Sequence, residues 1–545
     1  MLIPRAIKFL FPMLVASCQQ VYAQPQWTDL TPAKGARVYC VSSSTGSDSN
    51  PGTAAAPFRT LARGYAALAD QSPDQLLLKC GDTWNESFGA WQKSSGDPAA
   101  KMVLASYGTG PRPKLRTTGG AIYGGQQNRA GLLIADLDLA PIAPVSAAGI
   151  TFFAPWSYVT IEGCLIVGYS TNIVVQEVTP DRSVGWTIRN CVIVDSNEPG
   201  TGHSQGLFMG SCDGTVIEGN VFDLNASAKH DIFCHNVYLH QTCGPSTFRF
   251  NITARACSHG LQQRSGGWCE WNLALANPLG LFQGDGSAVF NTFRHNVALD
   301  SADISATNPR GFGFDLNAAF GAEVSDNIAA HQDHGTANCE GFNFDGAQLA
   351  TVRNNIAYDW ACPTVDWGHC FTGAVATFTG NRAFQPRGGE CLWGASGATS
   401  YSGNTYGTTT PARAFNGGSW ASWQAHEQMS VIVNPPVIDS RISAYMTTHG
   451  GGGLPEFMAE ARKLERFSDR PEFRAWTVNT WVRNRFNCYA DFDGDGHLSA
   501  NDFQAFLNAF GAGNPAANCD GSTAGPAMNV NDFNCFLNAF AVGCS

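Results

Sequence analysis

The 545-residue chain is poor in charged residues and especially in lysine. Only 14% of its residues are Asp, Glu, Lys or Arg, and Lys229 is the only lysine between Lys114 and Lys463. The net charge of −11 argues against nucleic acid as a partner, because binding to phosphates needs an excess of Lys and Arg. Catalysis by a lysine in the middle of the chain would depend on Lys229 alone.

The 18 cysteines contain no CxxC pair, which argues against a zinc site. After the N-terminal 23 residues, no segment approaches the roughly 18 uninterrupted apolar residues that a membrane-spanning helix needs. So many cysteines suit an oxidising compartment, and the 17 that follow Cys18 leave at least one thiol free. Closely spaced cysteines suggest disulfides between Cys234 and Cys243, Cys257 and Cys269, Cys362 and Cys370, and Cys535 and Cys544.

Residues 1–23 have the pattern of a signal peptide. Arg5 and Lys8 precede an apolar run, and small residues stand before Gln24. We therefore expect the chain to be secreted. An alternative is a lipoprotein, because the residues around Cys18 resemble a lipobox, which would leave that cysteine as a lipidated, cell-surface N-terminus.

Short apolar runs recur along most of the chain at intervals of 21 to 31 residues. Each run is rich in β-branched residues and is bounded by Gly, Asn or Asp, which favours strands. Repeats of this length must stack on their neighbours to bury a core, so the pattern predicts an all-β solenoid. One position of the repeat predicts a side-chain ladder along the axis: Leu137, Cys164, Cys191, Asn220, Asn251, Asn272, Asn296, Asn327, Asn355, Asn381 and Asn404.

Residues 36–90 contain a strand, an NPGT loop, a PFRT segment that opens a short helix at 58–68, and a second strand at 76–78. This order resembles the N-terminal cap of secreted proteins of the pectate-lyase-like superfamily. The resemblance implies a right-handed parallel β-helix, which we assign to residues 24–449, and an action on polysaccharide. A helix at the end of a solenoid covers the open core and the unpaired strand edge.

Residues 450–487 change to a helical pattern with an apolar stripe. Gly450–Gly453 precedes this segment and suggests a flexible junction. We expect the helices to form a cap and linker that packs against the C-terminal end of the solenoid. A partner-binding role for the same stripe is the alternative.

Residues 488–545 contain two related copies of one loop and one helix. The first loop has oxygen-bearing residues at the spacing of an EF-hand calcium loop, with Asp rather than Glu at its last position. A cation would relieve the repulsion between these carboxylates, so Ca²⁺ is the expected cofactor; a purely structural acidic tail is the alternative. The predicted ligands are Asp491, Asp493, Asp495, His497 through its carbonyl, Ser499 and Asp502.

Asp at the last ligand position, with one helix after each loop, resembles dockerin modules. The duplicated, C-terminal GC arrangement is similar to anchors of secreted bacterial enzymes, which implies a cohesin-like or cell-surface partner. The second copy has three extra residues before Asp532, so its calcium site is expected to be weaker or absent.

A parallel β-helix is filled inside, so a binding site must lie on an outer face. Strands of one sheet align on a small residue followed by an apolar one, from Gly149–Ile150 through Gly311–Phe312 to Gly341–Phe342. Period-two alternation then places a polar patch outward in the middle coils. Its candidate catalytic residues are Tyr238, His240, Arg264, Asp315 and Asp345, and its candidate sugar-binding residues are Phe208, Gln262, Phe282 and Asn343.

Two reactions fit this patch. A lyase acting on an acidic plant or algal polysaccharide could use His240 or Tyr238 as the base, with Arg264 as the stabiliser or as the base itself; calcium held by Asp315 and Asp345 could also stabilise. A hydrolase could use those two aspartates, because the expected register puts them on adjacent coils, roughly 5 Å apart, as in a retaining pair.

Other interpretations remain open for the same residues. The aspartates could be solvated turn residues, and the whole chain could be a non-catalytic glycan-binding or structural solenoid. The segment Ser258-His259-Gly260 resembles an element of polygalacturonases, but the NTD and DD elements of those enzymes are missing. His235 and His259 occupy equivalent places in their coils, where a bond to a turn carbonyl would explain them.

Overall fold

The computed structural model describes residues 24–542, with gaps at 126, 177–180, 201, 227–230, 286–288, 306, 319, 337–338, 363–367, 425, 428–429, 433–434, 436–437, 469, 487–489, 491, 493–497, 514–516, 518 and 520–527. Some of the predictions concern residues outside this set. They are the signal peptide with Cys18, Lys229, Cys544, and the calcium-loop residues Asp491, Asp493, Asp495 and His497.

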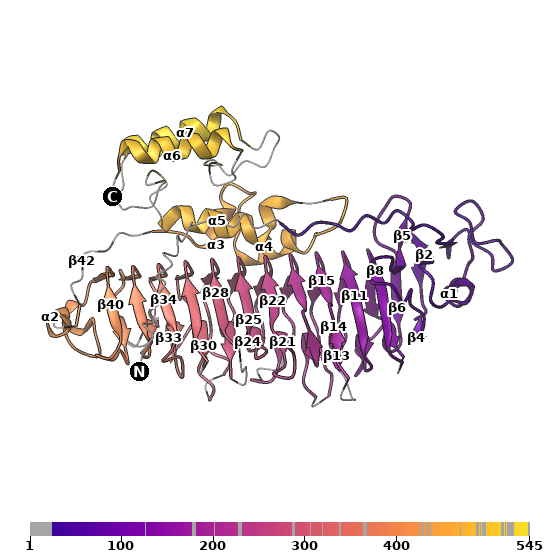
Figure 1. Ribbon diagram of the computed structural model, residues 1–545, viewed down its shortest axis with the longest axis horizontal. Coiled ribbons are helices and arrows are strands. Elements are labelled where there is room, and N and C mark those ends of the chain that lie inside the picture. Colours follow the sequence, from indigo (N-terminus) through magenta and orange to yellow (C-terminus); the bar gives the residue numbers. More distant parts are fainter. Residues whose placement is uncertain are drawn as a thin grey trace, which may run out of the picture.

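Three long parallel sheets wind the chain into a right-handed parallel β-helix (Figure 1). A typical coil contributes one strand to each sheet, and its strand pairs with the equivalent strands of the coils before and after it. Parallel strands joined by crossovers are right-handed in nearly all proteins. The predicted fold class is therefore confirmed.

Sheet A has 14 strands within the described residues: β1 (Val38–Val41), β2 (Gln75–Lys79), β5 (Met102–Tyr107), β8 (Arg129–Ala135), β11 (Trp156–Glu162), β15 (Thr187–Arg189), β19 (Val216–Glu218), β22 (Ser246–Arg249), β25 (Gly267–Glu270), β28 (Asn291–Arg294), β31 (Ala322–Ser325), β34 (Thr351–Arg353), β37 (Thr377–Thr379) and β40 (Ser400–Ser402). Sheet B also has 14 in that part of the chain: β3 (Thr83–Trp84), β6 (Lys114–Thr117), β9 (Asp138–Pro141), β12 (Leu165–Val167), β16 (Val192–Val194), β20 (Val221–Asp223), β23 (Ile252–Ala254), β26 (Leu273–Leu275), β29 (Val297–Leu299), β32 (Ile328–Ala330), β35 (Ile356–Tyr358), β38 (Arg382–Gln385), β41 (Thr405–Thr408) and β42 (Ser430–Ile432).

Sheet C has 12 strands among the residues described: β4 (Gly89–Trp91), β7 (Ile122–Gly124), β10 (Ala148–Phe152), β13 (Thr171–Gln176), β17 (Gln205–Gly210), β21 (His235–Leu239), β24 (His259–Gln263), β27 (Leu279–Gly284), β30 (Gly311–Asn317), β33 (Cys339–Asn343), β36 (Gly368–Thr372) and β39 (Glu390–Trp393). A small ribbon pairs β14 (Ser183–Val184) with β18 (Cys212–Asp213).

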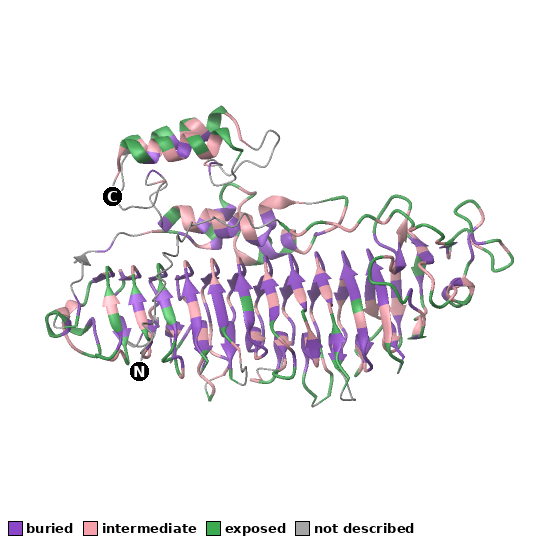
Figure 2. Cartoon of the chain, viewed as in Figure 1, coloured by how far each residue is buried: buried purple, intermediate pink, exposed green. Residues whose placement is uncertain are grey.

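The core consists of stacked apolar rows inside the coils. One inward row of sheet A stays in register through nine coils, and none of its side chains is more than 2% exposed. Figure 2 shows this buried interior along the length of the solenoid. Burial of side chains of this size stabilises the fold by about 1.5–3 kcal/mol each. The row is Ile161, Ile188, Ile217, Phe248, Cys269, Phe293, Val324, Val352 and Phe378.

The predicted asparagine ladder is present from Asn220 to Asn404 at the corner between sheets A and B. Asn296 is typical: its Nδ2 donates to Asn327 Oδ1 at 2.9 Å and to the Cys269 carbonyl at 2.8 Å. Its Oδ1 accepts the backbone N–H of Asn272 at 3.0 Å. Each side chain thus joins coils on both sides of it.

The residue before each ladder asparagine has a left-handed backbone conformation. Phe250, Trp271 and His295 have φ values of 57°, 56° and 53°. This conformation costs a residue with a side chain about 1–2 kcal/mol, so the hydrogen bonds of the ladder must hold the turn in place. The corner is the same in successive coils, and differences in coil length fall elsewhere.

A buried glutamate ends the ladder at the C-terminal coil. Asn404 Nδ2 donates to Glu427 Oε1 at 2.6 Å, and the Tyr406 hydroxyl donates to Glu427 Oε2 at 2.9 Å. The amide-to-amide bonds of the ladder all point towards this end, so the carboxylate meets the positive end of the aligned amide dipoles.

Short helices lie at both ends of the solenoid. Helix α1 (Leu61–Ala67) covers the first coil, within the range expected from the sequence, and the Thr60 hydroxyl accepts the Arg63 N–H at its N-terminus. At the other end, Trp423 of α2 (Trp420–Trp423) stacks against Phe415 with ring centroids 5.9 Å apart. A 3₁₀ turn, η1 (Pro411–Arg413), precedes it.

The helices of the 450–487 region do not pack on the C-terminal end, and that prediction was wrong. Helices α3 (Ile442–Met446), α4 (Leu454–Ala461) and α5 (Ala475–Phe486), with the 3₁₀ turn η2 (Pro471–Phe473), lie along the flank of the solenoid (Figure 1). Their apolar residues share one core cluster with the outer face of sheet B. Sheet B is therefore buried on both faces, which explains its fully apolar strands such as VIV, LAL and VAL.

The flank helices also bond to the ladder corner. Asn479 Nδ2 donates to the carbonyls of Asn272 and His295, at 3.1 and 2.8 Å. Near the N-terminal coils, Arg466 pairs with Asp136 and Glu162. The helices therefore tie together coils that lie far apart in the sequence.

Helices α6 (Ala500–Gly511) and α7 (Val530–Val542) come from the two C-terminal copies. Phe506 and Phe536, at equivalent places in the copies, stack with ring centroids 4.1 Å apart. Each helix begins with an aspartate side chain that accepts a backbone N–H: Asp502 from Ser499 and Asp532 from Asn529, both at 2.8 Å. The sequence duplication is thus a structural one as well.

The expected disulfides were wrong. Cys362 bonds to Cys339, not to Cys370, and Cys535 bonds to Cys519. Cys243, Cys257 and Cys269 carry free thiols; the thiol of Cys243 contacts that of Cys212, and the thiol of Cys257 contacts that of Cys234. Cysteines meet across neighbouring coils rather than within one coil, so spacing in the sequence is a poor guide to partners. No helix in the described part of the chain is long and apolar enough to cross a membrane.

Replacing Glu427 with Ala should destabilise the solenoid. Asn404 and Tyr406 would each lose an acceptor inside the protein, and an unsatisfied buried donor costs about 1–3 kcal/mol. Urea unfolding of the full chain would measure the loss. Glu427→Gln keeps one acceptor oxygen and should lose less; equal stability of Glu427→Ala and the unmodified protein would refute the role of Glu427.

Candidate functional site

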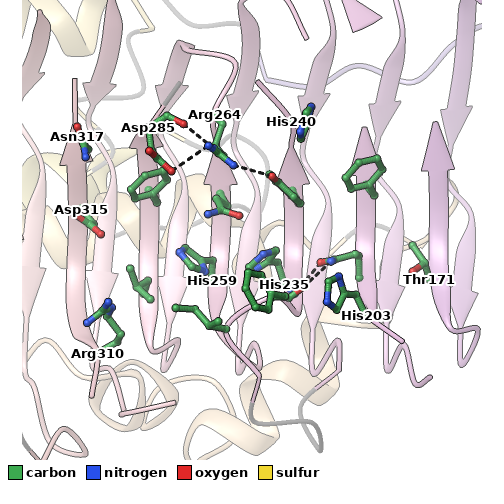
Figure 3. A pocket seen from close by; sticks show the side chains of 18 of the residues that line it. Thr171, His203, His235, His240, His259, Arg264, Asp285, Arg310, Asp315 and Asn317 are labelled. Carbon is green, nitrogen blue, oxygen red and sulfur yellow. Dashed lines mark hydrogen bonds and ion pairs between the residues drawn. The ribbon is translucent and has the colours of Figure 1, made fainter. Parts of the chain in front are cut away.

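A groove of about 730 Å³ crosses the outer face of sheet C from β13 to β30 (Figure 3). Between the strands that line the groove, the β-sheet pairing skips one residue in each strand. Asn236 of β21 and Gly260 of β24, for example, are not paired, although the residues on either side of them are. An added Cβ at Gly260 would lie 2.5 Å from the carbonyl oxygen of Gly280, so this place needs a small residue. Outward side chains on both sides of the interruption line the groove.

Strand register arranges these side chains in rows. The central row is Phe208, Tyr238, Gln262, Phe282 and Asp315. The histidine row, three residues earlier in each strand, is Gln205, His235, His259 and Leu279. His240, Arg264 and Asn317 stand two residues after the central row; Asn317 ends β30, while His240 and Arg264 directly follow β21 and β24.

Seven of the nine patch residues predicted from the sequence line the groove: Phe208, Tyr238, His240, Gln262, Arg264, Phe282 and Asp315. Asn343 stands one coil further on, and its Nδ2 donates to Asp315 Oδ1 at 3.0 Å. Asp345 is exposed and does not line the groove.

The predicted register of β30 was wrong by two residues. Phe314, not Phe312, pairs with Leu281 on one side and Phe342 on the other. The segment GFGFDLN contains two Gly–Phe pairs, and alternation with a period of two cannot choose between them.

Asp315 therefore faces Asn343 across the ladder, and Asp345 is only its diagonal neighbour. Diagonal neighbours have Cα atoms about 7–8 Å apart, so the reason for expecting these two aspartates to form a retaining pair disappears.

The middle of the groove holds a chain of polar contacts. Arg264 Nη1 donates to the Tyr238 hydroxyl at 3.2 Å, while its Nε donates to the Asp285 carbonyl at 2.7 Å. Arg264 Nη2 also lies 3.1 Å from Asp285 Oδ2. Figure 3 shows Arg264 beside Asp285. The ion pair fixes the guanidinium with one N–H directed at the phenol.

Four histidines line the groove: His203, His235, His240 and His259. Burial lowers the pKa of His259 to about 3 and the pKa of His235 well below its ordinary value. Burial and the nearby Arg264 also lower the pKa of His240. His259 Nδ1 lies 2.7 Å from Ser258 Oγ rather than at a turn carbonyl, and the rings of His235 and His259 meet edge to face. Each of these pKa shifts favours the neutral form of the imidazole in His235, His240 and His259.

Asp315 lies at the β30 end of the groove, and a second carboxyl group, Glu340 of the neighbouring strand β33, lies beside the groove without lining it. Burial raises the pKa of Asp315 to about 7, against the opposing effect of Arg310. Burial and the charge of Asp315 raise the pKa of Glu340 to about 7 as well. Glu340 Oε2 is buried and has no hydrogen-bond partner among the described residues. Perturbed carboxyl groups of this kind mark candidate acid–base sites.

The five predicted catalytic residues thus do not form one centre. Tyr238 and Asp315 stand three coils apart in the central row, about 14 Å at the usual strand spacing. Tyr238, His240 and Arg264 form one cluster, and Asp315 belongs with Glu340 and Arg310 in another.

Sequence reasoning missed several residues of the groove. His203, Asp285 and Arg310 lie in loops, where strand alternation says nothing about position. Glu340 lies beside the groove without lining it and could have been found, because it directly precedes Gly341 as His235 and His259 directly precede their small residues. No group of three or more His, Cys, Asp or Glu that could hold a metal ion occurs among the described residues, so nothing in them adds support for calcium between Asp315 and Asp345.

No protein-family model and no curated protein matches the chain. Among solved structures it resembles the pectate lyase Pel9A, with 15% identity, coverage of 76% of this chain and 84% of that chain, and a TM-score of 0.39. For the GH136 lacto-N-biosidase from Eubacterium ramulus the values are 12%, 73%, 68% and 0.34. For XylC in complex with xylose they are 10%, 72%, 86% and 0.44. TM-scores and identities this low do not extend the activity of those proteins to this chain.

Asp315→Asn should change how stability depends on pH. A carboxyl whose folded-state pKa is raised stabilises the fold below its ordinary pKa and loses that contribution as pH rises through about 7. The amide cannot ionise, so the variant should gain stability relative to the unmodified protein between pH 4 and pH 7.5. Chemical unfolding at several pH values would measure this. Asp97→Asn, at an exposed site, is the control. If the stability of Asp315→Asn and that of the unmodified protein depend on pH in the same way, the raised pKa of Asp315 is contradicted.

Proposed function

We propose that this chain is an exported, carbohydrate-active enzyme that hydrolyses a polysaccharide bound along the groove of sheet C. The observation that carries the proposal is the placement of two acids on neighbouring strands: Asp315 lines the groove at β30, and Glu340 of β33 keeps a buried, unpartnered Oε2. Burial raises the pKa of each to about 7. A glycoside hydrolase needs one protonated and one ionised carboxyl at the same pH, and a coupled pair can supply both.

In this proposal Asp315 is the general acid. Its raised pKa keeps a proton available at neutral pH for the glycosidic oxygen of the leaving sugar. Glu340, as the carboxylate, acts as the base towards water or as the nucleophile. Arg310, whose charge lowers the pKa of both groups, stabilises the ionised member of the pair.

The rest of the groove suits a sugar chain. Phe208 and Phe282 present aromatic rings in the central row, and Gln262 between them offers hydrogen bonds to hydroxyl groups. The chain would run along the solenoid axis, so each coil would contact a successive part of it.

A lyase is the second candidate, and the contact between Arg264 and Tyr238 favours it. A guanidinium that donates to a phenol oxygen stabilises the phenolate, which could take the proton at C5 of a uronate. The same guanidinium could bind the uronate carboxylate. His240 lies beside Tyr238, with ring centroids 5.8 Å apart, and is an alternative base.

The two reactions can be told apart on a panel of neutral and uronate polysaccharides. Hydrolysis should release reducing sugar without absorbance near 235 nm. Asp315→Asn and Glu340→Gln should each lower the rate by about 10²–10⁴-fold, because each removes a proton-transfer group. Asp345→Asn should keep most activity. Because the charge of Asp345 helps to raise the pKa of Asp315, this variant should lose activity at a slightly lower pH than the unmodified protein as the pH is increased.

Unsaturated products that absorb near 235 nm, lost in Tyr238→Phe and Arg264→Ala but kept in Asp315→Asn, would establish the lyase instead. Tyr158→Phe, at an exposed tyrosine of sheet A, is the matched control. If the protein binds a polysaccharide but releases no product from any member of the panel, a glycan-binding solenoid is favoured.

We also propose that residues 488–545 form a calcium-dependent, dockerin-like anchor for a cohesin-like or cell-surface partner. Support comes from the two helices of equivalent design and from Asp502, the last predicted ligand, which is fully buried at the start of α6. Ser499, another predicted ligand, caps the same helix. A cation in the loop would offset the charge of its aspartates.

Calcium should raise the unfolding temperature of this C-terminal part of the full chain. Asp493→Ala should abolish that increase, because it removes an early ligand of the first loop. Calorimetry with added calcium and then with a chelator would measure it, with Asp97→Ala as the control. An unchanged transition in the unmodified protein would refute the calcium site.

A further inference from the structure

The central row of the groove continues beyond Asp315 to an exposed tryptophan. Asp315 pairs with Asn343, Asn343 with Thr372, and Thr372 with Trp393 of β39. Residues that pair in register point to the same face of a sheet. Trp393 is 38% exposed, so a large aromatic ring lies open on the face that carries the groove, about 14 Å from Asp315.

Trp393 is not needed to cover the core at this end of the solenoid. Its neighbour Leu392 points inward and is buried, and the buried rings of Phe415 and Trp423 complete the core beyond it. An exposed Trp on a polar face that does not fill the core is typical of a binding surface.

Polar groups without partners surround this tryptophan. The ring of His369 stacks with the indole, with centroids 5.4 Å apart and an angle of 20° between the planes. Neither ring nitrogen of His369 has a hydrogen-bond partner among the described residues, and the same holds for Thr372 Oγ1. Buried polar groups are nearly always satisfied, so these atoms are candidates to bond an incoming ligand after a small adjustment.

The charges near Trp393 select the kind of ligand. Glu390 pairs with His369 in register and accepts the Gly417 N–H at 3.2 Å. Glu340 pairs with His369 on the other side. Two carboxyl groups flank the histidine, and burial lowers the pKa of His369 to about 4, so it adds no positive charge at neutral pH. Arg413 Nη2 lies 3.6 Å from Glu390 Oε1 and balances that carboxylate, so the groups around His369 offer no excess of positive charge to an anionic sugar.

We propose that Trp393, with His369 and Thr372, forms a distal subsite for a neutral sugar residue of the chain that occupies the groove. The indole face stacks on the sugar ring, and the partnerless side chains bond its hydroxyl groups. The inference rests on the proposed function, because it assumes a glycan in the groove. It adds that the glycan extends about three coils past Asp315 and carries uncharged residues there.

Binding, rather than activity, tests this subsite in the full chain. The probes are soluble xylan, mixed-linkage β-glucan and polygalacturonate, followed by affinity electrophoresis and calorimetry. Trp393→Ala should weaken binding of a neutral polymer about tenfold. Trp268→Ala is the matched control, since this tryptophan is 47% exposed on sheet A, away from the groove, and binding should change less than twofold.

Chain length gives a second readout. Oligosaccharides cut from the bound polymer should show the Trp393→Ala effect only when they are long enough to reach from the carboxyl pair to β39. Short oligosaccharides should bind equally to both proteins.

The outcomes separate this inference from the proposed function. If Tyr238→Ala weakens polymer binding but Trp393→Ala does not, the groove binds glycan and the distal subsite is refuted. Preferential Trp393-dependent binding of polygalacturonate would refute the neutral-sugar assignment. If the unmodified protein binds none of the three polymers, the subsite and the proposed glycan-binding groove both fail.

Discussion

The corner between sheets A and B is the constraint on which the rest of the molecule depends. A left-handed residue followed by an asparagine recurs in successive coils, and each asparagine amide bonds to the coils before and after it. Because that corner is fixed, every coil starts sheet B at the same place, whatever its length. Register is then preserved around the coil, which is why Tyr238, Gln262, Phe282 and Asp315 form a straight row despite unequal spacing in the sequence.

The parts of the structure that follow from this local rule could be predicted from the sequence. The ladder and the outward face of sheet C follow from repeated short patterns, and the N-terminal cap was predicted from its resemblance to the caps of a known superfamily. Parts that depend on contacts between distant segments could not. Cys339 forms a disulfide with Cys362 of the neighbouring coil, and Arg466 forms an ion pair with Asp136, which is far away in the sequence. The apolar strands of sheet B did carry a signal, because a strand that faced solvent on one side would alternate.

The candidate site shows the same division. Tyr238 and Arg264 were placed correctly because they lie in strands of unambiguous alternation. Asp315 was placed on the correct face but in the wrong row, because GFGFDLN repeats its own pattern. Glu340, which gives the site its paired carboxyl groups, lies just before the strand pattern begins. Local alternation fixes the face of a residue but not its burial, and burial sets the pKa of both acids.

The three faces of the solenoid differ in ways that leave only one of them suited to bind a ligand. Sheet B is covered by the flank helices. On sheet A an outward row alternates in charge, and Arg189 and Arg249 both reach Glu218 between them, so its charges are neutralised within the protein. On the outer face of sheet C, Arg264 pairs with Asp285 and Arg413 with Glu390. Glu340, His369 and Thr372 nevertheless keep polar atoms without partners in the described structure. Leaving such atoms unsatisfied costs stability, and this cost is spread along one face from the groove to Trp393. A continuous row of unpartnered polar atoms along the solenoid axis fits a long, extended ligand better than a small one.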